Sequence, residues 1–404
     1  MADEKNLFVE LEHEVMELWE KEKYYDKLVE KNKGNKMFRF LDGPITANNP
    51  MGIHHAWGRS TKDIFIRYKS MHGYDCRRQN GFDSQGLWVE VEVEKQLGFK
   101  TKKDIENYGM DKFTRQCVDR VKHFSGIITE QSKRLGMWMD WDNSYYTNTD
   151  LNIQGIWHFL KECDNHGWIQ REYKPMPWCP RCGTSLSEHE MTGSYKMMTH
   201  NSVFFKLPIE ELDSKILVWT TTPWTLSSNV ALAVNPEIDY VEVKIKSDDQ
   251  TLILAKNAIK YLGDDKLEVL RALKGEELVG LHYETCFADI PAQQGFEHKI
   301  VAWEDVAADE GTGVVHIAPG CGIEDFELGE RLGLPKVMPI DDTGIYLDGF
   351  GFMSGKDSHT IADEVFEKLD EQNKLYKVEP HEHSYPVCWR CKSEIVFRLV
   401  PAWY

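Results

Sequence analysis

The chain has 404 residues, a hydrophobic content of 41% and a formal net charge of −18. This length predicts roughly two to three domains, each large enough to bury a core of its own. No apolar run approaches bilayer length, and the acidic start lacks a signal-peptide core, so we expect a cytoplasmic protein with no membrane partner. The acidic balance argues against a surface that is basic overall. We interpret the basic runs at Arg77, Arg78 and 100–103 as solvated surface.

The first elements in chain order alternate between helices and strands. Residues 1–28 are predicted to form an amphipathic, acidic helix, and the apolar run 37–44 is predicted to be a strand. Further helices are predicted over 53–71, 86–97, 111–134 and 151–166. Strands that alternate with helices in this way are typical of an α/β fold with a doubly wound sheet.

The junction between the strand at 37–44 and the next helix carries the first candidate site. A loop rich in Asn, Pro and Gly leads into the helix, and Gly52, His54 and His55 stand at its start. A helix N-terminus of this kind presents free backbone N–H groups to an anion. The sequence therefore predicts an anion-binding junction here.

Two Cys-x-x-Cys pairs form the second candidate site. They are Cys179 with Cys182, and Cys388 with Cys391. In a reducing compartment such pairs are more often metal-binding knuckles than disulfides, and four thiolates complete a closed structural zinc site. Two separate turns with idle thiols, or a redox pair, are the alternatives. The other five cysteines are interpreted as small buried hydrophobic residues: Cys76, Cys117, Cys163, Cys286 and Cys321.

If the two knuckles share one metal ion, the residues between them leave and return at one point, as an inserted domain does. This insert consists of short β-rich runs separated by Gly, Pro and Asn. The predicted strands lie within 200–208, 215–222, 230–236, 239–245, 250–255 and 311–319.

Seven motifs, taken in order, carry a resemblance to a known family. They are FLDGPITANNPMGIHHAWGRSTKDIFIRYKSMHGYD, GFDSQGLWVEVEVEKQLG, RLGMWMDWDNSYYT, WCPRCGTSLSEHE, WTTTPWTLSSNVALAVNP, GTGVVHIAPGCGIEDFELG and HSYPVCWRCKSEIVFRLVPAWY. In this order they resemble the isoleucyl-tRNA synthetases, a family of class I aminoacyl-tRNA synthetases. The Thr-Thr-Thr-Pro-Trp-Thr-Leu run is the most specific of them, because valyl and leucyl relatives differ there.

The resemblance implies a ligase of protein biosynthesis with ATP, Mg²⁺, isoleucine and tRNA-Ile as reactants or partners, and a structural Zn²⁺. It also implies hydrolytic editing of mischarged valyl-tRNA-Ile. The resemblance implies four domains. Residues 1–170 hold the N-terminal helix and the first half of a Rossmann-like catalytic domain, and residues 171–198 hold the first knuckle and a connector. Residues 199–376 form a β-rich, barrel-like editing domain, and residues 377–404 hold the second knuckle and the return to the catalytic domain.

The activation residues are also carried over by resemblance. Where the family signature is His-x-Gly-His, this chain has Gly52-Ile53-His54-His55, with the first and third positions exchanged. The resemblance assigns Gly52, His54 and His55 to ATP binding and the two histidines to catalysis. Gly43 and Pro44 are placed beside the substrate amino acid. Asp83 is matched to the carboxylate that binds the α-ammonium, with a helix N-cap as the alternative.

The editing residues come from the insert. The resemblance assigns hydroxyls and an amide to the terminal adenosine and a water molecule, and a carboxylate to the α-ammonium of the wrong amino acid. An imidazole lies nearby in the sequence. The alternative is that strand threonines are common and that the histidine is a satisfied core residue. Cys321 stands where the family usually has a second histidine. The assigned residues are Thr220, Thr221, Thr222, Thr225, Asn229, His316 and Asp325.

The family's Lys-Met-Ser-Lys-Ser run does not occur in the 404 residues. We therefore expect the N-terminal part of a longer synthetase, as a monomer or paired with a C-terminal part. A free-standing deacylase of mischarged tRNA and a non-catalytic zinc-bound RNA-binding module are the alternatives. The activation motifs favour the ligase, because a deacylase does not need them.

Overall fold

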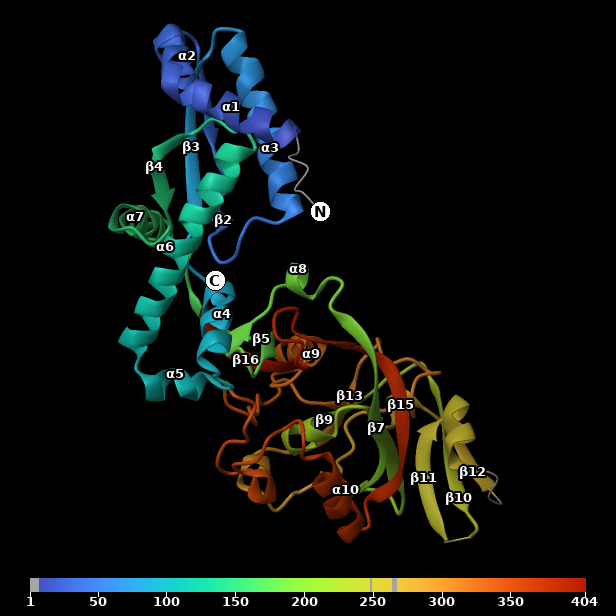
Figure 1. Cartoon of the computed structure of the whole chain (residues 1–404). Helices are drawn as coiled ribbons and strands as arrows, with labels where there is room; N and C mark the ends of the chain where they lie inside the picture. Colours follow the sequence, from blue (N-terminus) through green and yellow to red (C-terminus); the bar gives the residue numbers. More distant parts are fainter. Residues whose placement is uncertain (1–6, 248, 264–266) are drawn as a thin grey trace. The chain divides into compact units, whose positions relative to one another are not determined.

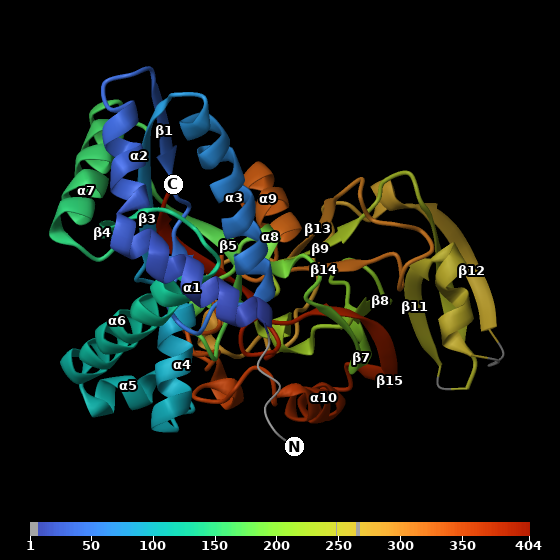
Figure 2. The same cartoon turned by 45° about the horizontal axis from the view of Figure 1, so that its top comes forward.

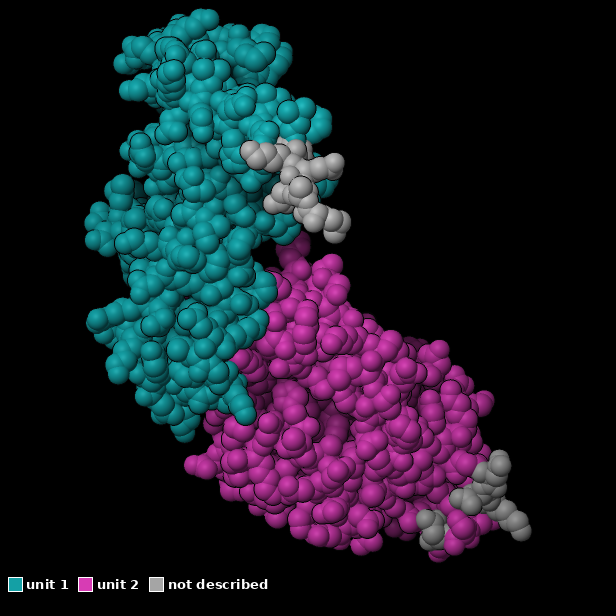
Figure 3. All heavy atoms as spheres, viewed as in Figure 1, with its two compact units in different colours: residues 1–169 teal, residues 170–404 magenta. Residues whose placement is uncertain are grey.

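The structure is a computed structural model, and it describes residues 7–247, 249–263 and 267–404 (Figure 1). The chain divides into two compact units, residues 1–169 and residues 170–404, which are coloured separately in Figure 3. No helix in the described part of the chain is both long and apolar enough to cross a membrane.

Unit 1 is an α/β unit built on a parallel sheet. Strands β1, β2 and β4 each pair with β3 in parallel, so β3 is central. The elements are α1 (Leu7–Glu22), α2 (Tyr24–Asn32), β1 (Met37–Leu41), β2 (Ile45–Thr46), α3 (Ile53–Met71), β3 (Asp75–Asp83), α4 (Leu87–Leu97), α5 (Lys102–Tyr108), α6 (Met110–Arg134), β4 (Asp140–Tyr146) and α7 (Asp150–Asn165).

The helices predicted from periodicity are confirmed. The helix predicted over 53–71 has these bounds as α3, and α4, α6 and α7 begin and end within one residue of their predicted bounds. The N-terminal helix differs, because it ends at Glu22 and a second helix begins at Tyr24, with Lys23 between them in the left-handed conformation at φ 50°. Residues 1–6 of that prediction lie outside the described residues.

The core of unit 1 lies where α4 and α6 contact the sheet. Val121 and Ile128 on α6 stand seven residues apart, two helical turns, and so share a face. They pack with Phe82 from β3 and Val89 from α4. This packing fixes the carboxyl end of β3 and the loop that leads into α3.

Unit 2 is mainly β. Its elements are β5 (Arg171–Cys179), β6 (Thr184–Ser185), α8 (Glu188–Met191), β7 (Tyr195–Pro208), β8 (Lys215–Thr220), η1 (Pro223–Ser228), β9 (Ala231–Val234), β10 (Asp239–Ile245), β11 (Gln250–Ala255), η2 (Lys256–Leu262), β12 (Leu267–Lys274), η3 (Gly275–Glu277), η4 (Pro291–Gln293), β13 (Lys299–Ala302), β14 (Val315–Ile317), α9 (Ile323–Leu332), η5 (Gly351–Met353), α10 (Ala362–Glu371), β15 (Leu375–Pro386) and β16 (Val396–Trp403). The η elements are short 3₁₀ helices.

The largest sheet of unit 2 has six strands in the order β12-β10-β11-β8-β7-β15, and β7 and β15 run side by side in Figures 1 and 2. Two further sheets have the orders β13-β9-β14 and β16-β5-β6. The prediction of a β-rich insert is confirmed. The predicted barrel is not confirmed, because the six-stranded sheet of the described residues is open, with β12 and β15 as its two edges.

The chain enters and leaves unit 2 on neighbouring strands. Strand β16 pairs with β5 in antiparallel register, and the backbone N–H and C=O groups of Tyr404 and Gln170 exchange hydrogen bonds of 2.9 and 3.0 Å. Residues 170–404 therefore form an excursion that returns beside its starting point. The predicted bounds at 198 and 376 fall inside β7 and β15, and the four-part division stays a proposal.

Candidate functional site

A cavity of about 630 Å³ in unit 1 opens at the N-terminus of α3. Most of the predicted activation residues line it: Gly43, Pro44, Gly52, His54 and His55. Because β1 ends at Leu41 and α3 begins at Ile53, the short segment between them, which includes β2, brings the two halves of this lining together.

The rings of His54 and His55 lie against each other, and His55 also accepts a backbone hydrogen bond. Their ring centroids lie 3.8 Å apart, and the backbone N–H of Gly52 donates to Nδ1 of His55 at 3.2 Å. Partial burial, with His54 and Arg59 nearby, lowers the pKa of His55 below its ordinary value. His55 is therefore neutral at pH 7. Since its Nδ1 accepts a hydrogen bond, its proton resides on Nε2.

Gly52 has extended backbone angles of φ −82° and ψ 168°, so it is not needed for a left-handed conformation. A Cβ at this position would lie 3.0 Å from Cε1 and 3.1 Å from Nδ1 of His54. The glycine therefore leaves room for the first imidazole, which is a packing reason for the residue.

Sequence reasoning missed two cations that line the same cavity, Arg59 and Lys62. The carboxylate of Asp42, at the end of β1, lies between them: Oδ1 is 2.7 Å from Nζ of Lys62, and Oδ2 is 3.7 Å from Nη2 of Arg59. Arg59 is only 3% exposed and also donates to Oδ1 of Asn80 at 3.2 Å. Their spacing of four and seven residues from His55 was a signal available in the sequence, because it places all three on one helix face.

This arrangement suits a polyanion. The backbone N–H groups at the start of α3 carry a partial positive charge, which the two cations reinforce. One carboxylate faces two cations, so the cavity keeps an excess positive charge although the whole chain is acidic.

Asp83 does not line this cavity, although its partner Thr46 does. Its Oδ2 accepts from the hydroxyl of Thr46 at 3.0 Å, and its Oδ1 accepts from the backbone N–H of Gln85 at 3.1 Å. The N-cap alternative is wrong, because the residue that caps α4 is Gly86. The assignment of Asp83 to a substrate ammonium stays a prediction.

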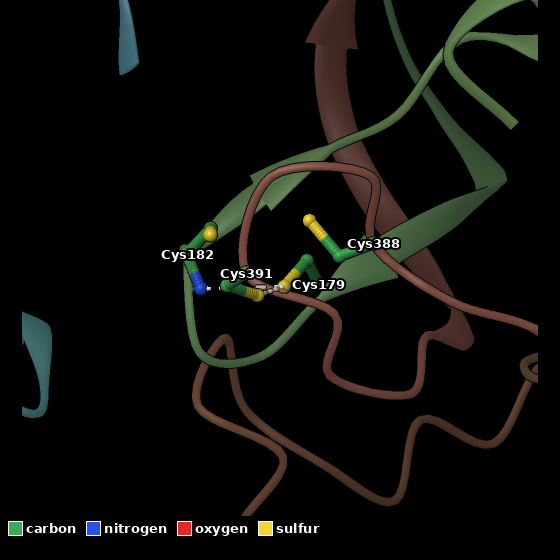
Figure 4. A group of neighbouring side chains, drawn as sticks. All are labelled: Cys179, Cys182, Cys388 and Cys391. Carbon is green, nitrogen blue, oxygen red and sulfur yellow. Dashed lines mark hydrogen bonds between the residues drawn. The ribbon is translucent and has the colours of Figure 1, made fainter. Parts of the chain in front are cut away.

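The four knuckle cysteines converge in unit 2 (Figure 4), and their sulfur atoms all lie within 4.8 Å of one another. The two sulfurs of Cys179 and Cys391 are 3.5 Å apart, too far for a disulfide. Both knuckles make the same turn, since the residues that follow them, Gly183 and Lys392, have φ of 60° and 67° and donate to the first cysteine's carbonyl at 2.8 Å. Because the four sulfur atoms converge, the alternative of two separate turns is wrong.

The donor set fits a metal ion. Tetrahedral zinc with bonds of about 2.3 Å places its sulfur ligands about 3.8 Å apart. The observed cluster is of this size, and Cys179, Cys182 and Cys388 are buried. The structure thus provides four thiols that could hold an ion such as zinc. Of the five other cysteines, Cys286 and Cys321 are buried as predicted, and the remaining three are half-buried.

Three of the predicted editing residues form a buried hydrogen-bonded network. Nε2 of His316 lies 2.7 Å from the hydroxyl of Thr225, which itself donates to the carbonyl of Thr222 at 2.9 Å. Nδ1 of His316 lies 3.1 Å from Nδ2 of Asn229, whose Oδ1 accepts from the hydroxyl of Tyr283 at 2.6 Å. Because Thr225 donates elsewhere, His316 donates through Nε2 and accepts through Nδ1.

Both ring nitrogens of His316 thus have partners, and burial lowers its pKa to about 4. The geometry agrees with the alternative stated above, a satisfied core histidine. Two other predicted residues, Thr221 and Thr222, line a separate cavity of about 230 Å³. Thr220 lies beside them and accepts from the backbone N–H of Thr222 at 3.1 Å.

Asp325 lies on the first turn of α9, and its Oδ2 accepts from the backbone N–H of Ala318 at 2.8 Å. Burial raises its pKa to about 6, against the lowering effect of that hydrogen bond. Neither Asp325 nor His316 is among the described residues that line the 230 Å³ cavity. The structure therefore divides the predicted editing residues between a cavity wall, a buried network and a helix start.

Comparison with known proteins supports the sequence resemblance. The family described as tRNA synthetases class I (I, L, M and V) matches residues 14–404. The chain belongs to the class I tRNA synthetases.

Curated relatives in this family are similar over nearly the whole chain. An isoleucine–tRNA ligase of Thermococcus kodakarensis is 39% identical over 98% of the chain, and one of Clostridium tetani is 38% identical over 100% of it. The chain spans 38% and 39% of the length of these two relatives. A solved leucyl-tRNA synthetase editing domain of P. knowlesi covers 45% of this chain and 97% of its own, at 13% identity and a TM-score of 0.35, which is too weak for an inference.

The buried groups of this synthetase chain predict opposing pH effects. His316 stays neutral in the folded chain until about pH 4, whereas its ordinary pKa is 6.5. As the pH falls, the unfolded chain therefore binds a proton before the folded chain does. The stability of the fold decreases between pH 6.5 and 4, by up to about 3 kcal/mol. Asp325 is protonated in the folded chain from about pH 6 but in the unfolded chain only near 3.8. It therefore adds stability as the pH falls, by at most about 3 kcal/mol.

Denaturant titrations between pH 7 and 4 separate the two contributions. We expect Asp325→Asn to lose stability on acidification more steeply than the parent chain, and His316→Gln to lose it less steeply. Parallel stability profiles for the parent and both variants would show that these two groups titrate as they do in the unfolded chain.

Proposed function

We propose that the chain is part of an isoleucine–tRNA ligase that activates isoleucine with ATP and transfers it to tRNA-Ile, and that unit 2 hydrolyses mischarged valyl-tRNA-Ile. The observation that carries the proposal is the 630 Å³ cavity, where a glycine, two imidazoles and two cations meet at a helix N-terminus in a chain of this family. A free-standing deacylase gains no support, because it has no use for such a cavity.

Five of the residues that line the cavity have a role in the proposed activation step. The carboxylate of isoleucine attacks the α-phosphate of ATP, and pyrophosphate leaves. Chemistry of this kind depends on positioning and on stabilising charge at the phosphate oxygens. His55 donates from Nε2 to a phosphate oxygen, and Arg59 and Lys62 attract the triphosphate. Gly43 and Pro44 form the side of the cavity proposed for isoleucine.

The exchanged signature Gly52-Ile53-His54-His55 supplies the same residue types as the family pattern. In this chain His54 occupies the space that a side chain at position 52 would fill. We propose a working pocket of altered contour. Mg²⁺ accompanies ATP as part of the substrate, and the four thiolates hold a structural zinc ion outside the reaction.

Unit 2 supplies the proposed editing step. Thr221 and Thr222 offer hydroxyls at the wall of the 230 Å³ cavity, and the network of Thr225, Asn229 and His316 fixes the backbone that carries them. Asp325 is proposed for the α-ammonium of the wrong amino acid. A hydrophobic pocket gains only about 1–3 kcal/mol per methylene, a limit for which isoleucyl-tRNA synthetases are the usual example, so hydrolysis of the valyl product is needed.

Calorimetric titration with ATP and Mg²⁺ tests the activation site. Gly52→Ala should weaken ATP binding about tenfold, because the new methyl group displaces the His54 ring at a cost of about 1 to 2 kcal/mol. Gly58→Ala is the matched control, since Gly58 lines the same cavity but a Cβ there meets open space. Absence of ATP binding by the parent chain, or equal losses in both variants, would argue against this site.

A further inference from the structure

The 230 Å³ cavity of unit 2 has a second wall that sequence reasoning did not find. Thr221 and Thr222 form one side, and His200, Ser358 and Glu394 also line it. The volume is below the roughly 300–1,000 Å³ of sites for drug-sized ligands. The cavity therefore accommodates a small group, such as an ester-linked amino acid, rather than a whole nucleotide.

His200, on β7, lies between a carboxylate and a second imidazole. Its Nε2 is 3.4 Å from Oε2 of Glu394, and its Nδ1 is 3.4 Å from Nε2 of His383 on β15. The side chains of His200 and Glu394 are 27% and 31% exposed. When Glu394 accepts the proton on Nε2, the lone pair of the His200 ring is on Nδ1. Nδ1 of His383 donates to the carbonyl of His381 at 3.3 Å, so Nε2 of a neutral His383 also holds a lone pair and donates no hydrogen bond to Nδ1 of His200. Both contacts are long, so the ring can exchange one of them for a water molecule.

Ser358 provides an independent sign of a ligand. The residue is 3% exposed, and its hydroxyl has no hydrogen-bond partner among the described residues. A buried hydroxyl without a partner costs stability, and a ligand in the cavity would satisfy it.

The charge of the lining limits what binds. Glu394 is the carboxylate of the described lining, and this lining contains no lysine or arginine. A phosphate group would find no cation here, whereas a neutral ester or an ammonium group would meet no repulsion. The cavity therefore suits the aminoacyl end of a charged tRNA better than an aminoacyl-adenylate.

We propose that His200 is the general base of the hydrolytic reaction and that Glu394 positions its ring, an inference that rests on the editing function proposed above. A water molecule attacks the ester carbonyl carbon and gives a proton to Nδ1 of His200. The ester C–O bond then breaks, and the ribose oxygen leaves with the proton that the imidazolium returns. The products are the free amino acid and a tRNA with a free terminal hydroxyl, so atoms and charges balance.

Several titratable groups surround His200. On β15 these are His381, His383 and Tyr385, whose ring centroid lies 4.9 Å from that of His200. Burial raises the pKa of Tyr385 to about 12, so Tyr385 stays neutral, and burial lowers the pKa of His383, which therefore stays neutral at pH 7. Among these neighbours Glu394 is the carboxylate, and its Oε2 lies 3.4 Å from Nε2 of His200, where it can orient the ring.

The test measures single-turnover hydrolysis of valyl-tRNA-Ile by the 404-residue chain at pH values from 5.5 to 8.5. His200→Gln should lower the rate constant at saturating tRNA by about 10²- to 10⁴-fold, the usual contribution of a general base, with little change in the half-saturating concentration. Glu394→Gln should retain more activity and move the acidic limb of the rate profile to lower pH. His381→Gln is the control, because His381 neighbours His383 but does not line the cavity.

The outcomes separate this inference from the editing proposal. Full activity of His200→Gln beside an active parent chain would overturn the role of His200 and leave editing intact. His359 is the other histidine of the described lining. If His359→Gln lost most of the activity while His200→Gln stayed active, the role of general base would belong to His359, and the inference would be overturned. A parent chain without hydrolysis at saturating tRNA would overturn both proposals.

Discussion

Replacing Cys388 with serine should abolish stoichiometric zinc binding and unfold the knuckle end of the β5–β16 sheet. The purified parent chain is expected to contain one zinc ion per molecule, because four thiols converge within 4.8 Å. Structural zinc in small peptides contributes about 10–16 kcal/mol of apparent binding energy at pH 7, so losing one ligand should have a large local effect. Elemental analysis and hydrogen exchange of the amides in β5 and β16 measure the two consequences.

Cys163→Ser is the matched control, because Cys163 is half-buried on α7 and lies outside the cluster. It should keep the zinc and the exchange protection of the parent. A parent chain without stoichiometric metal, or a Cys388→Ser variant that keeps the full content, would contradict the proposed zinc site.

Replacing Asp42 with alanine should destabilise unit 1 by about 3–5 kcal/mol, the usual cost of leaving a buried charge without its partner. Arg59 is 3% exposed, and without Asp42 the amide oxygen of Asn80 would be its one remaining hydrogen-bonding oxygen among the described residues. Burial already lowers the pKa of Arg59 and Asp42 raises it, so removing Asp42 takes away the group that favours the charged form. Hydrogen exchange of the α3 amides measures the loss within unit 1.

Lys62→Ala is the control for this prediction. Lys62 is 37% exposed and shares the same carboxylate, but its removal leaves Asp42 beside Arg59. We expect a loss below about 1 kcal/mol, as for a partly exposed ion pair. Similar losses in both variants would show that Asp42 is not the buried partner that Arg59 requires.

Local sequence patterns predicted four helices of unit 1 to within one residue, and six of the described strands of unit 2. Periodicity placed α3 to the residue, and the runs at 239–245 and 250–255 are β10 and β11 with the same bounds. These segments carry strong apolar patterns and turn residues at their ends. The two knuckles were also predictable, because each ligand pair is only three residues apart and the turn is fixed locally.

Features that depend on long-range packing were not predicted. The contact of Asp42 with Arg59 and Lys62 requires a strand end to meet a helix face, which the spacing on α3 indicates only in part. The threonine run appeared as one site, yet Thr222 lines a cavity while Thr225 bonds to His316 in a buried network. Closure of a sheet likewise depends on strand pairing far apart in the sequence, and the predicted barrel is not confirmed, because the six-stranded sheet of the described residues is open.

We propose two activities in separate units, activation at the 630 Å³ cavity of unit 1 and editing in unit 2. The proposed editing residues all lie in unit 2. We therefore expect the 404-residue chain to hydrolyse mischarged tRNA without residues from outside this unit.

Deacylation of pre-charged valyl-tRNA-Ile by the 404-residue chain, compared with isoleucyl-tRNA-Ile, tests the claim most directly. We predict hydrolysis of the valyl ester that is faster than that of the isoleucyl ester and that needs a high tRNA concentration. No hydrolysis at saturating tRNA, or equal rates for the two esters, would contradict the assignment of editing to unit 2.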